Sequence, residues 1–141
     1  MRYHYENKTE LRVRYGETDQ MGYCYYGNYA QYFEVGRVEA LRSLGMSYRE
    51  LEKNGIMLPV SIFNVRYILP AKYDDLLTVT TRIIAVEGAR IVFEYVITNE
   101  LNDKICEADT TLVFVSNKTM RPTAPSDEFL KILEPYLLHD E

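Results

Sequence analysis

The chain has 141 residues, which is enough for one domain with a substantial core and too few for two independent domains. Apolar residues make up 47% of the sequence and charged residues 26%, an ordinary balance for a globular protein, and no apolar run approaches the ~20 residues that span a bilayer. The net charge is −5 and the basic residues are scattered, so nucleic acid is not expected to be the main partner.

The chain opens with a polar segment and a short predicted strand. Residues 1–13 contain no apolar signal core, so we expect no export signal and a cytoplasmic protein. Residues 11–15 alternate apolar and charged side chains, which is the period-two pattern of a half-buried strand. A loop punctuated by three glycines follows over residues 16–27.

The longest helical pattern in the sequence begins directly after this loop. Projected at about 100° per residue, its apolar stripe consists of Tyr29, Phe33, Gly36, Ala40 and Leu44. Further apolar residues flank this stripe, so the helix is expected to pack on a broad surface such as a sheet. A glycine inside a helix costs roughly 1 kcal/mol relative to alanine, so Gly36 is expected to permit close approach by a strand or a ligand. Gly45 ends the helix.

The remaining sequence predicts a short helix, four strands and a closing helix. A capping box at residues 47–50 starts the short helix, which Gly55 ends. The strands are rich in Val, Ile, Thr, Phe and Tyr and cover residues 60–69, 76–86, 90–99 and 104–116. Short connectors with turn residues join the last three as antiparallel hairpins. The closing helix is predicted over residues 127–138.

A single apolar helix between the first strand and a meander is best buried by a sheet that curls around it. We therefore predict an α+β fold over residues 1–141, with an antiparallel sheet of five to six strands around one long central helix. In the strand over residues 76–86, Leu77 and Val79 share one face, while Leu76 and Ile84 share the other. A sheet that is apolar on both faces favours a partner subunit, so we expect a homo-oligomer.

Cysteine and histidine usage restricts the chemistry. Cys24 and Cys106 show no CxxC spacing, and without an export signal both are expected to be reduced thiols. Cys24 is either a nucleophile or an apolar filler, and the filler is favoured because no base or positive charge is visible beside it. His4 and His139 lie near the chain ends, so interior Ser–His–acid sites and His-rich metal sites are hard to build. Any hydrolysis is then expected to depend on a carboxylate.

Asp19 is the leading carboxylate. It lies just before the long helix, where free backbone N–H groups can polarise a carbonyl oxygen. The alternative role is that of a loop or capping carboxylate, the commonest role of Asp before a helix. Glu17 and Glu34 are weaker candidates, and Glu34 is expected to pair with Arg37 across one helical turn.

The same stretch carries a family signature, which consists of residues 15–22 (YGETDQMG), residues 25–29 (YYGNY), Phe33, Glu34 and Arg37, with a later segment at residues 67–75 (YILPAKYDD). Together these residues resemble the hotdog-fold acyl-CoA thioesterases, in the 4-hydroxybenzoyl-CoA thioesterase branch that includes the Tol–Pal-associated bacterial thioesterases. The similarity runs over nearly the whole chain. It implies a hotdog fold, hydrolysis of an acyl-CoA thioester, and a homodimer or a dimer of dimers (a homotetramer) with sites at subunit junctions. It implies no metal and no cofactor apart from the coenzyme A of the substrate.

The resemblance also implies roles for individual residues. Asp19 acts as a nucleophile or as a general base on water, while the backbone N–H of Tyr26 holds the thioester oxygen. Asn28 either orients a water or caps the helix. The expected substrate-binding residues are Gly22, Tyr25, Gly27, Tyr29, Ser61 and Asn64. Of these, Ser61 and Asn64 are the small polar groups of the strand facing the helix, and we expect them to reach the same pocket. For Tyr25 and Tyr29 the alternative is a place in the core or in an interface.

Basic residues are expected near the mouth of the site because coenzyme A carries phosphates. The candidates at strand ends are Arg90, Lys118 and Arg121, and the alternative for each is a solvated surface charge. Many Tol–Pal-associated relatives have a histidine where this chain has Tyr26, so a histidine-assisted mechanism is not expected here. Two further functions stay open, namely an acyl-carrier-protein thioesterase and a non-catalytic acyl-CoA-binding sensor.

Overall fold

The computed structural model describes residues 1–139, so residues 140 and 141 of the predicted domain lie outside the described part of the chain. In chain order the elements are β1 (Arg2–Arg12), η1 (Tyr15–Glu17), η2 (Tyr26–Asn28), α1 (Tyr29–Ser43), α2 (Tyr48–Lys53), β2 (Ile56–Met57), β3 (Val60–Tyr67), β4 (Leu76–Glu87), β5 (Arg90–Thr98), β6 (Lys104–Val113), β7 (Val115–Ser116), α3 (Asp127–Leu133) and η3 (Glu134–Tyr136). None of the helices in residues 1–139 is long and apolar enough to cross a membrane.

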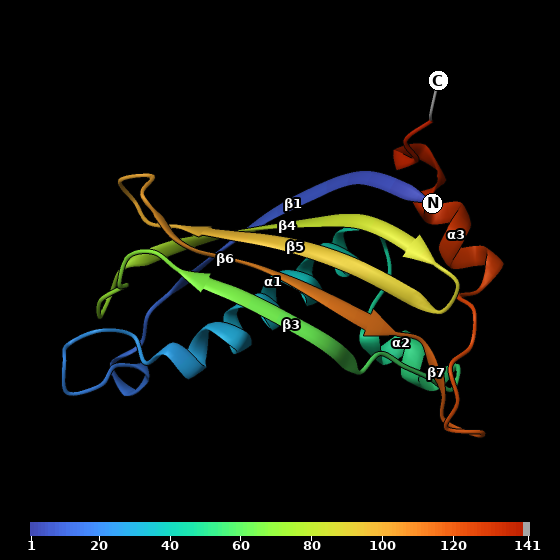
Figure 1. The fold of residues 1–141 in the computed structure, drawn as a ribbon, viewed down its shortest axis with the longest axis horizontal. Coiled ribbons are helices and arrows are strands. Elements are labelled where there is room, and N and C mark those ends of the chain that lie inside the picture. The colour runs from blue at the N-terminus through green and yellow to red at the C-terminus, as the bar shows by residue number, and fades with distance from the viewer. Residues whose placement is uncertain (140–141) are drawn as a thin grey trace.

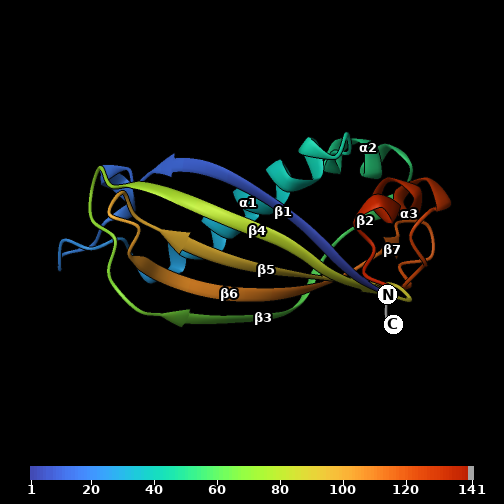
Figure 2. The same cartoon turned by 90° about the horizontal axis from the view of Figure 1, so that it is seen from above.

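One antiparallel sheet of five strands, in the order β1-β4-β5-β6-β3, curls around α1 (Figure 1). Seen from above, the strands run side by side along α1, while α2, α3 and the short β2–β7 ladder lie together at one end (Figure 2). The predicted α+β architecture, with a sheet wrapped around one long central helix, is therefore confirmed.

The core lies between α1 and the sheet. The buried residues of α1 are Tyr29, Tyr32, Phe33, Gly36, Arg37, Ala40 and Leu41. Opposite them lie inward-facing side chains of the sheet with no exposed surface, among them Leu77, Val79, Ile83, Phe93 and Ile97. The predicted apolar stripe is confirmed, with Leu44 half-buried directly after the helix.

Gly36 brings α1 into direct contact with β4. A Cβ atom on Gly36 would lie 2.5 Å from Thr81 Oγ1 and 2.7 Å from Val79 Cγ1. Both distances are too short for non-bonded atoms, so the absence of a side chain is what lets the helix lie on the strand. Of the two expected reasons for this glycine, packing against a strand is the one that the structure shows.

Strand β1 begins earlier than predicted. It covers Arg2–Arg12 instead of residues 11–15, and it pairs with β4 along most of its length. Only alternate positions of β1 are covered by the rest of the protein, while Glu6, Lys8 and Glu10 are exposed. An exposed face needs no apolar side chains, which is why the segment shows little apolar pattern. Pairing with β4 rather than intrinsic propensity makes this segment a strand.

Three other elements differ from the prediction by more than one residue. The strand predicted over residues 104–116 is interrupted at Phe114, whose N–H bonds to Ala89, and β7 then leaves the main sheet to pair with β2. Strand β3 ends at Tyr67, two residues before the predicted end. Helix α3 ends at Leu133, where the chain passes into the short helix η3, and Pro135 in η3 lacks the N–H that a continued α-helix would use.

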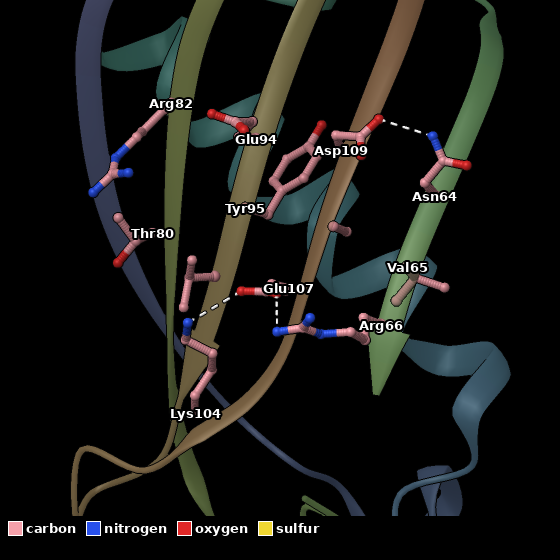
Figure 3. Close-up of a pocket in the computed structure, with 12 residues that line it drawn as sticks. Asn64, Val65, Arg66, Thr80, Arg82, Glu94, Tyr95, Lys104, Glu107 and Asp109 are labelled. Carbon is pink, nitrogen blue, oxygen red and sulfur yellow. Dashed lines mark hydrogen bonds and ion pairs between the residues drawn. The ribbon is translucent and has the colours of Figure 1, made fainter. Parts of the chain in front are cut away.

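The sheet face turned away from α1 mixes charged side chains with half-buried apolar ones such as Leu76 and Val96, so it is less apolar than predicted. A groove of about 500 Å³ lies on this face. Its charged lining consists of Arg66, Arg82, Glu94, Lys104, Glu107 and Asp109 (Figure 3). Glu107 forms ion pairs with both Arg66 and Lys104. Leu76 and Ile84 are only half-buried on this side. The charges that line this groove do not favour apolar packing of this face against a partner.

The contact at Gly36 predicts a specific cost for a single methyl group. We expect Gly36→Ala to lower the free energy of unfolding by about 1–3 kcal/mol, because overpacking against Thr81 and Val79 outweighs the roughly 1 kcal/mol gained in helix propensity. Urea denaturation at neutral pH measures this difference. Gly16→Ala is the control, since a Cβ atom there meets nothing within 4 Å. A Gly36→Ala protein as stable as the wild type would show that the contact is not tight.

Candidate active site

The loop between η1 and η2 holds Asp19 in a tight turn. The N–H of Asp19 donates to the carbonyl of Tyr23 (2.9 Å), and the N–H of Gly22 donates to the carbonyl of Asp19 (3.0 Å). Gly22 has φ +82°, a conformation that side chains rarely adopt, so its role here is to close the turn. The Asp19 carboxylate is half-buried and accepts a hydrogen bond from the N–H of Met21 through Oδ1 (2.9 Å).

Glu17 fastens this loop to the start of α1. Its carbonyl accepts from the N–H of Tyr25 (2.8 Å) and from Nδ2 of Asn28 (2.8 Å). Its buried carboxylate accepts from the N–H of Arg14 (2.8 Å) and from the hydroxyl of Tyr32 (2.9 Å), which lies on α1. The Arg14 guanidinium adds an ion pair at 3.0 Å. From the sequence alone Glu17 is a weak candidate, because nothing in its spacing indicates these long-range contacts.

The pKa of Glu17 reflects this surrounding. Burial alone acts to raise the pKa of this carboxyl, but the hydrogen bonds from Arg14 and Tyr32 and the charge of Arg14 outweigh burial and hold the pKa below its usual range. Glu17 is therefore an ionised, hydrogen-bonded carboxylate beneath the loop.

Tyr26 opens the helical segment that continues into α1. It is the first residue of η2, so its N–H has no acceptor inside that helix, and it makes no hydrogen bond within residues 1–139. The Tyr26 carbonyl accepts from the hydroxyl of Tyr67 (3.4 Å), and the residue as a whole is 62% exposed. A free N–H at the positive end of a helix is suited to bind a carbonyl oxygen or an anion.

Asn28 is the N-cap residue of α1, but its side chain makes no capping hydrogen bond. Its side-chain amide donates instead to the carbonyl of Glu17. Asn28 therefore stands at the N-cap position, but the expected capping by its side chain is not observed. Its observed role is to join the helix start to the loop.

Four tyrosines, which we call the tyrosine cluster, meet beside this N–H: Tyr25, Tyr26, Tyr29 and Tyr67. Ring centroids lie 4.7 Å apart for Tyr25 and Tyr26, 6.1 Å for Tyr26 and Tyr67, and 5.6 Å for Tyr29 and Tyr67. Tyr29 is buried and its hydroxyl accepts from the N–H of Ala71, so it belongs to the core, and burial raises its pKa. Tyr25 and Tyr67 are about half exposed and form the open wall. The sequence did not predict Tyr67 at the site. It lies four residues after the helix-facing Phe63 and so on the same face of β3.

The cysteines behave as packing residues. Cys24 is buried behind the loop and its thiol lies 3.4 Å from the hydroxyl of Tyr32. Burial raises the pKa of Cys24, and it raises the pKa of Cys106 to about 12. Both groups are therefore thiols rather than thiolates at neutral pH, which favours the filler role for Cys24.

Ser61 and Asn64 do not reach the tyrosine cluster within one copy of the chain. Phe63 packs on Phe33 of α1, so Asn64, the next residue along the strand, points to the opposite face. There its Nδ2 donates to Asp109 Oδ2 at 3.1 Å (Figure 3). Ser61 donates to the carbonyl of Thr111 at 3.1 Å. The expectation that Asn64 faces the helix is wrong, because the register of β3 puts even-numbered residues on the outer face.

The three basic candidates lie far from Asp19 in the same subunit. β4 begins beside the loop, where the N–H of Val13 bonds to Asp75, and Arg90 follows the other end of β4. Lys118 and Arg121 follow β7, also at that far end (Figure 1). A single copy therefore does not bring these side chains to the tyrosine cluster.

Arg37 also differs from its predicted role, because it does not pair with Glu34. It turns into the core, where its Nε donates to the hydroxyl of Tyr48 (3.0 Å) and its Nη1 to the hydroxyl of Tyr95 (3.2 Å). Glu34 stays exposed on α1. The inward rotation of Arg37 follows from its position on the buried side of α1.

The sequence matches a known family. Residues 21–106 match the model of the thioesterase superfamily, and the chain belongs to this superfamily. It is 35% identical to the putative acyl-CoA thioesterase YneP of Bacillus subtilis, over 82% of this chain and 84% of the relative. It is 33% identical to the acyl-CoA thioester hydrolase YbgC of Escherichia coli O6:H1, over 81% of this chain and 85% of the relative.

The fold matches a solved thioesterase. The DHNA-CoA thioesterase from Staphylococcus aureus superimposes with a TM-score of 0.89 at 33% identity, covering 93% of this chain and 90% of that one. The resemblance to hotdog-fold acyl-CoA thioesterases is thereby confirmed.

The low pKa of Glu17 predicts a pH dependence of stability. The contribution of the ionised carboxylate to the free energy of unfolding is complete above its unfolded-state pKa, about 4.3. This contribution is lost as the pH falls through the lower folded-state pKa. We therefore expect wild type to be more stable than Glu17→Gln at neutral pH, with a difference that shrinks below about pH 4.3. Urea denaturation of both proteins across this range measures it. Glu34→Gln, which changes an exposed carboxylate of α1, controls for the loss of one charge. A difference that stays constant with pH contradicts the assignment.

Proposed function

We propose that this chain hydrolyses an acyl-CoA thioester to the free acid and coenzyme A. Asp19 either attacks the thioester carbon as a nucleophile or, as a general base, activates the water that attacks it. The N–H of Tyr26 polarises the carbonyl oxygen. The single observation that carries this proposal is that one short loop holds a half-buried carboxylate close in sequence to a free helix-start N–H, and that Glu17 joins the two. The printed functions of the relatives support the same reaction.

The chemistry matches these groups. Attack on a thioester places negative charge on the carbonyl oxygen, and a backbone N–H at a helix start stabilises that charge without a proton of its own to transfer. Loss of one such donor typically costs on the order of 10²-fold in rate. The Met21 N–H holds Oδ1 of Asp19 and so orients the carboxylate, while no hydrogen bond within residues 1–139 occupies Oδ2. The exposed walls of the tyrosine cluster, Tyr25 and Tyr67, are suited to contact the acyl group.

We further propose that a second copy of the chain completes the site by pairing along β3. The two sheet edges differ: β1 exposes Glu6, Lys8 and Glu10, whereas β3 exposes large apolar side chains. These are Val60, Ile62, Phe63 and Tyr67, each 40–49% exposed. An apolar edge strand with unpaired N–H and C=O groups favours pairing with another strand, and charged side chains oppose it.

Two-fold symmetry requires equivalent β3 strands to pair antiparallel. The Tyr67 end of one β3, which contacts Tyr26, would then lie beside the Val60 end of the other. The partner subunit's Lys118 and the partner subunit's Arg121, at the far end of the sheet in their own copy, approach the tyrosine cluster in this arrangement. There the two side chains are suited to bind coenzyme A phosphates. Arg90 lies on β5, two strands away from the β3 edge. We propose in addition that two such dimers assemble into a tetramer. We also propose a cytoplasmic location.

Removal of the carboxylate tests the catalytic assignment. We expect Asp19→Ala and Asp19→Asn to lower kcat/KM by about 10²- to 10⁴-fold, the usual contribution of an acid–base group. Release of free thiol from a panel of acyl-CoA substrates measures turnover, and Asp103→Asn, at an exposed loop position, is the control. Undiminished hydrolysis in both Asp19 variants would contradict the role of Asp19. Turnover restricted to acyl-carrier-protein substrates identifies that class instead, and tight acyl-CoA binding without turnover identifies a sensor.

A charge on the apolar edge tests the shared site. We expect the wild type to sediment as a dimer or tetramer at micromolar concentration and Ile62→Lys to shift toward the monomer with reduced turnover, because a lysine on an edge strand opposes pairing. Glu10→Lys on the β1 edge is the matched control. A wild type that is a stable monomer would rule out a site shared between copies.

A further inference from the structure

Glu17 is a buried carboxylate that the proposed reaction does not use. It is 9% exposed and lies two positions before Asp19. Its Oε1 accepts from the backbone N–H of Arg14 (2.8 Å) and from the hydroxyl of Tyr32 (2.9 Å). One oxygen therefore joins Arg14, two residues after the end of β1, to Tyr32 near the start of α1.

The backbone of the same residue holds the other side of the loop. The Glu17 carbonyl receives the N–H of Tyr25, directly before the proposed oxyanion donor Tyr26, and the side chain of Asn28, at the N-cap of α1. Hydrogen bonds of Glu17 thus reach both ends of the segment that carries Asp19 and Tyr26. No hydrogen bond within residues 1–139 connects Asp19 to Tyr26 directly.

We propose that Glu17 is a positioning residue, whose carboxylate fixes the distance and orientation between the Asp19 loop and the Tyr26 N–H through Tyr32 and Arg14. This inference rests on the proposed function of Asp19 and Tyr26. The two groups act on one thioester carbon and its oxygen, so their separation must be held closely, and a misplacement of about 1 Å can cost ~10²-fold in rate.

The ion pair with Arg14 is not the main source of this effect. The Arg14 side chain is 79% exposed, and an ion pair with an exposed arginine contributes little. The two hydrogen bonds to Oε1 need an acceptor oxygen rather than a charge, and the amide oxygen of glutamine can supply it. A positioning carboxylate is therefore replaceable by an amide, whereas a nucleophile or general base such as Asp19 is not.

The experiment compares Glu17→Ala, Glu17→Gln and Tyr32→Phe in the full-length chain, at a temperature where each variant is folded. For Glu17→Ala we expect kcat to fall by ~10- to 100-fold with KM changed less than about threefold, because the groups are present but misaligned. Glu17→Gln should retain kcat within about threefold, and the double variant Glu17→Ala/Tyr32→Phe should be no slower than Glu17→Ala, since both changes break the same link.

Amide hydrogen exchange at Met21 and Tyr25, whose N–H groups donate to Asp19 Oδ1 and to the Glu17 carbonyl, provides a readout that does not depend on turnover. We expect faster exchange at both amides in Glu17→Ala than in wild type and little change in Glu17→Gln. Unchanged exchange together with an unchanged kcat in folded Glu17→Ala would overturn the positioning role, as would a Glu17→Gln protein as inactive as Asp19→Asn. A wild type without turnover overturns the proposed function instead, and the exchange rates then still decide whether Glu17 holds the loop.

Discussion

The close approach of α1 to β4 is the constraint on which the rest of the structure depends. Gly36 has no side chain, so the helix lies directly on Val79 and Thr81. This contact sets the depth and rotation of α1 in the curled sheet. About one turn earlier the same helix face carries Tyr32, which reaches Glu17. Nearly one further turn earlier lies Tyr29, whose hydroxyl accepts from the N–H of Ala71. The direction of the free N–H at the helix start therefore follows from packing in the middle of the helix.

Buried polar groups restrict the helix to this one position. Arg37 donates to the hydroxyls of Tyr48 and Tyr95, and the Tyr95 hydroxyl lies 2.6 Å from Thr110 Oγ1. Burial of a guanidinium is costly, and a rotated helix would leave these donors unpaired at about 1–3 kcal/mol each. The hydrogen bond between Glu17 and Tyr32 imposes the same condition near the start of α1. Apolar contacts alone would tolerate small rotations, whereas these directional bonds do not.

The distribution of surface residues explains why chemistry and assembly are proposed at the same edge. The outer face of the sheet carries charged ladders, and the β1 edge carries alternating charges, so neither offers a continuous apolar surface. The β3 edge instead exposes Val60, Ile62 and Phe63, and its last residue, Tyr67, contacts Tyr26. A partner on this edge would cover the open side of the tyrosine cluster. Exclusion of water there would strengthen every electrostatic interaction with the developing oxyanion.

The sequence by itself determined the central helix, the main hairpins and the candidate carboxylate Asp19, because apolar periodicity and turn residues are local signals. It also indicated the close approach at Gly36 and the packing role of Cys24. The course of β1, the mixed polar and apolar outer face, the orientation of Asn64 and the inward turn of Arg37 were decided only by the tertiary structure. Each depends on strand register or on a partner distant in sequence, and a one-residue change of register moves a side chain to the opposite face. The same reason applies to Glu17, whose importance comes from its bonds to Tyr25, Asn28 and Tyr32, which only the folded chain brings together.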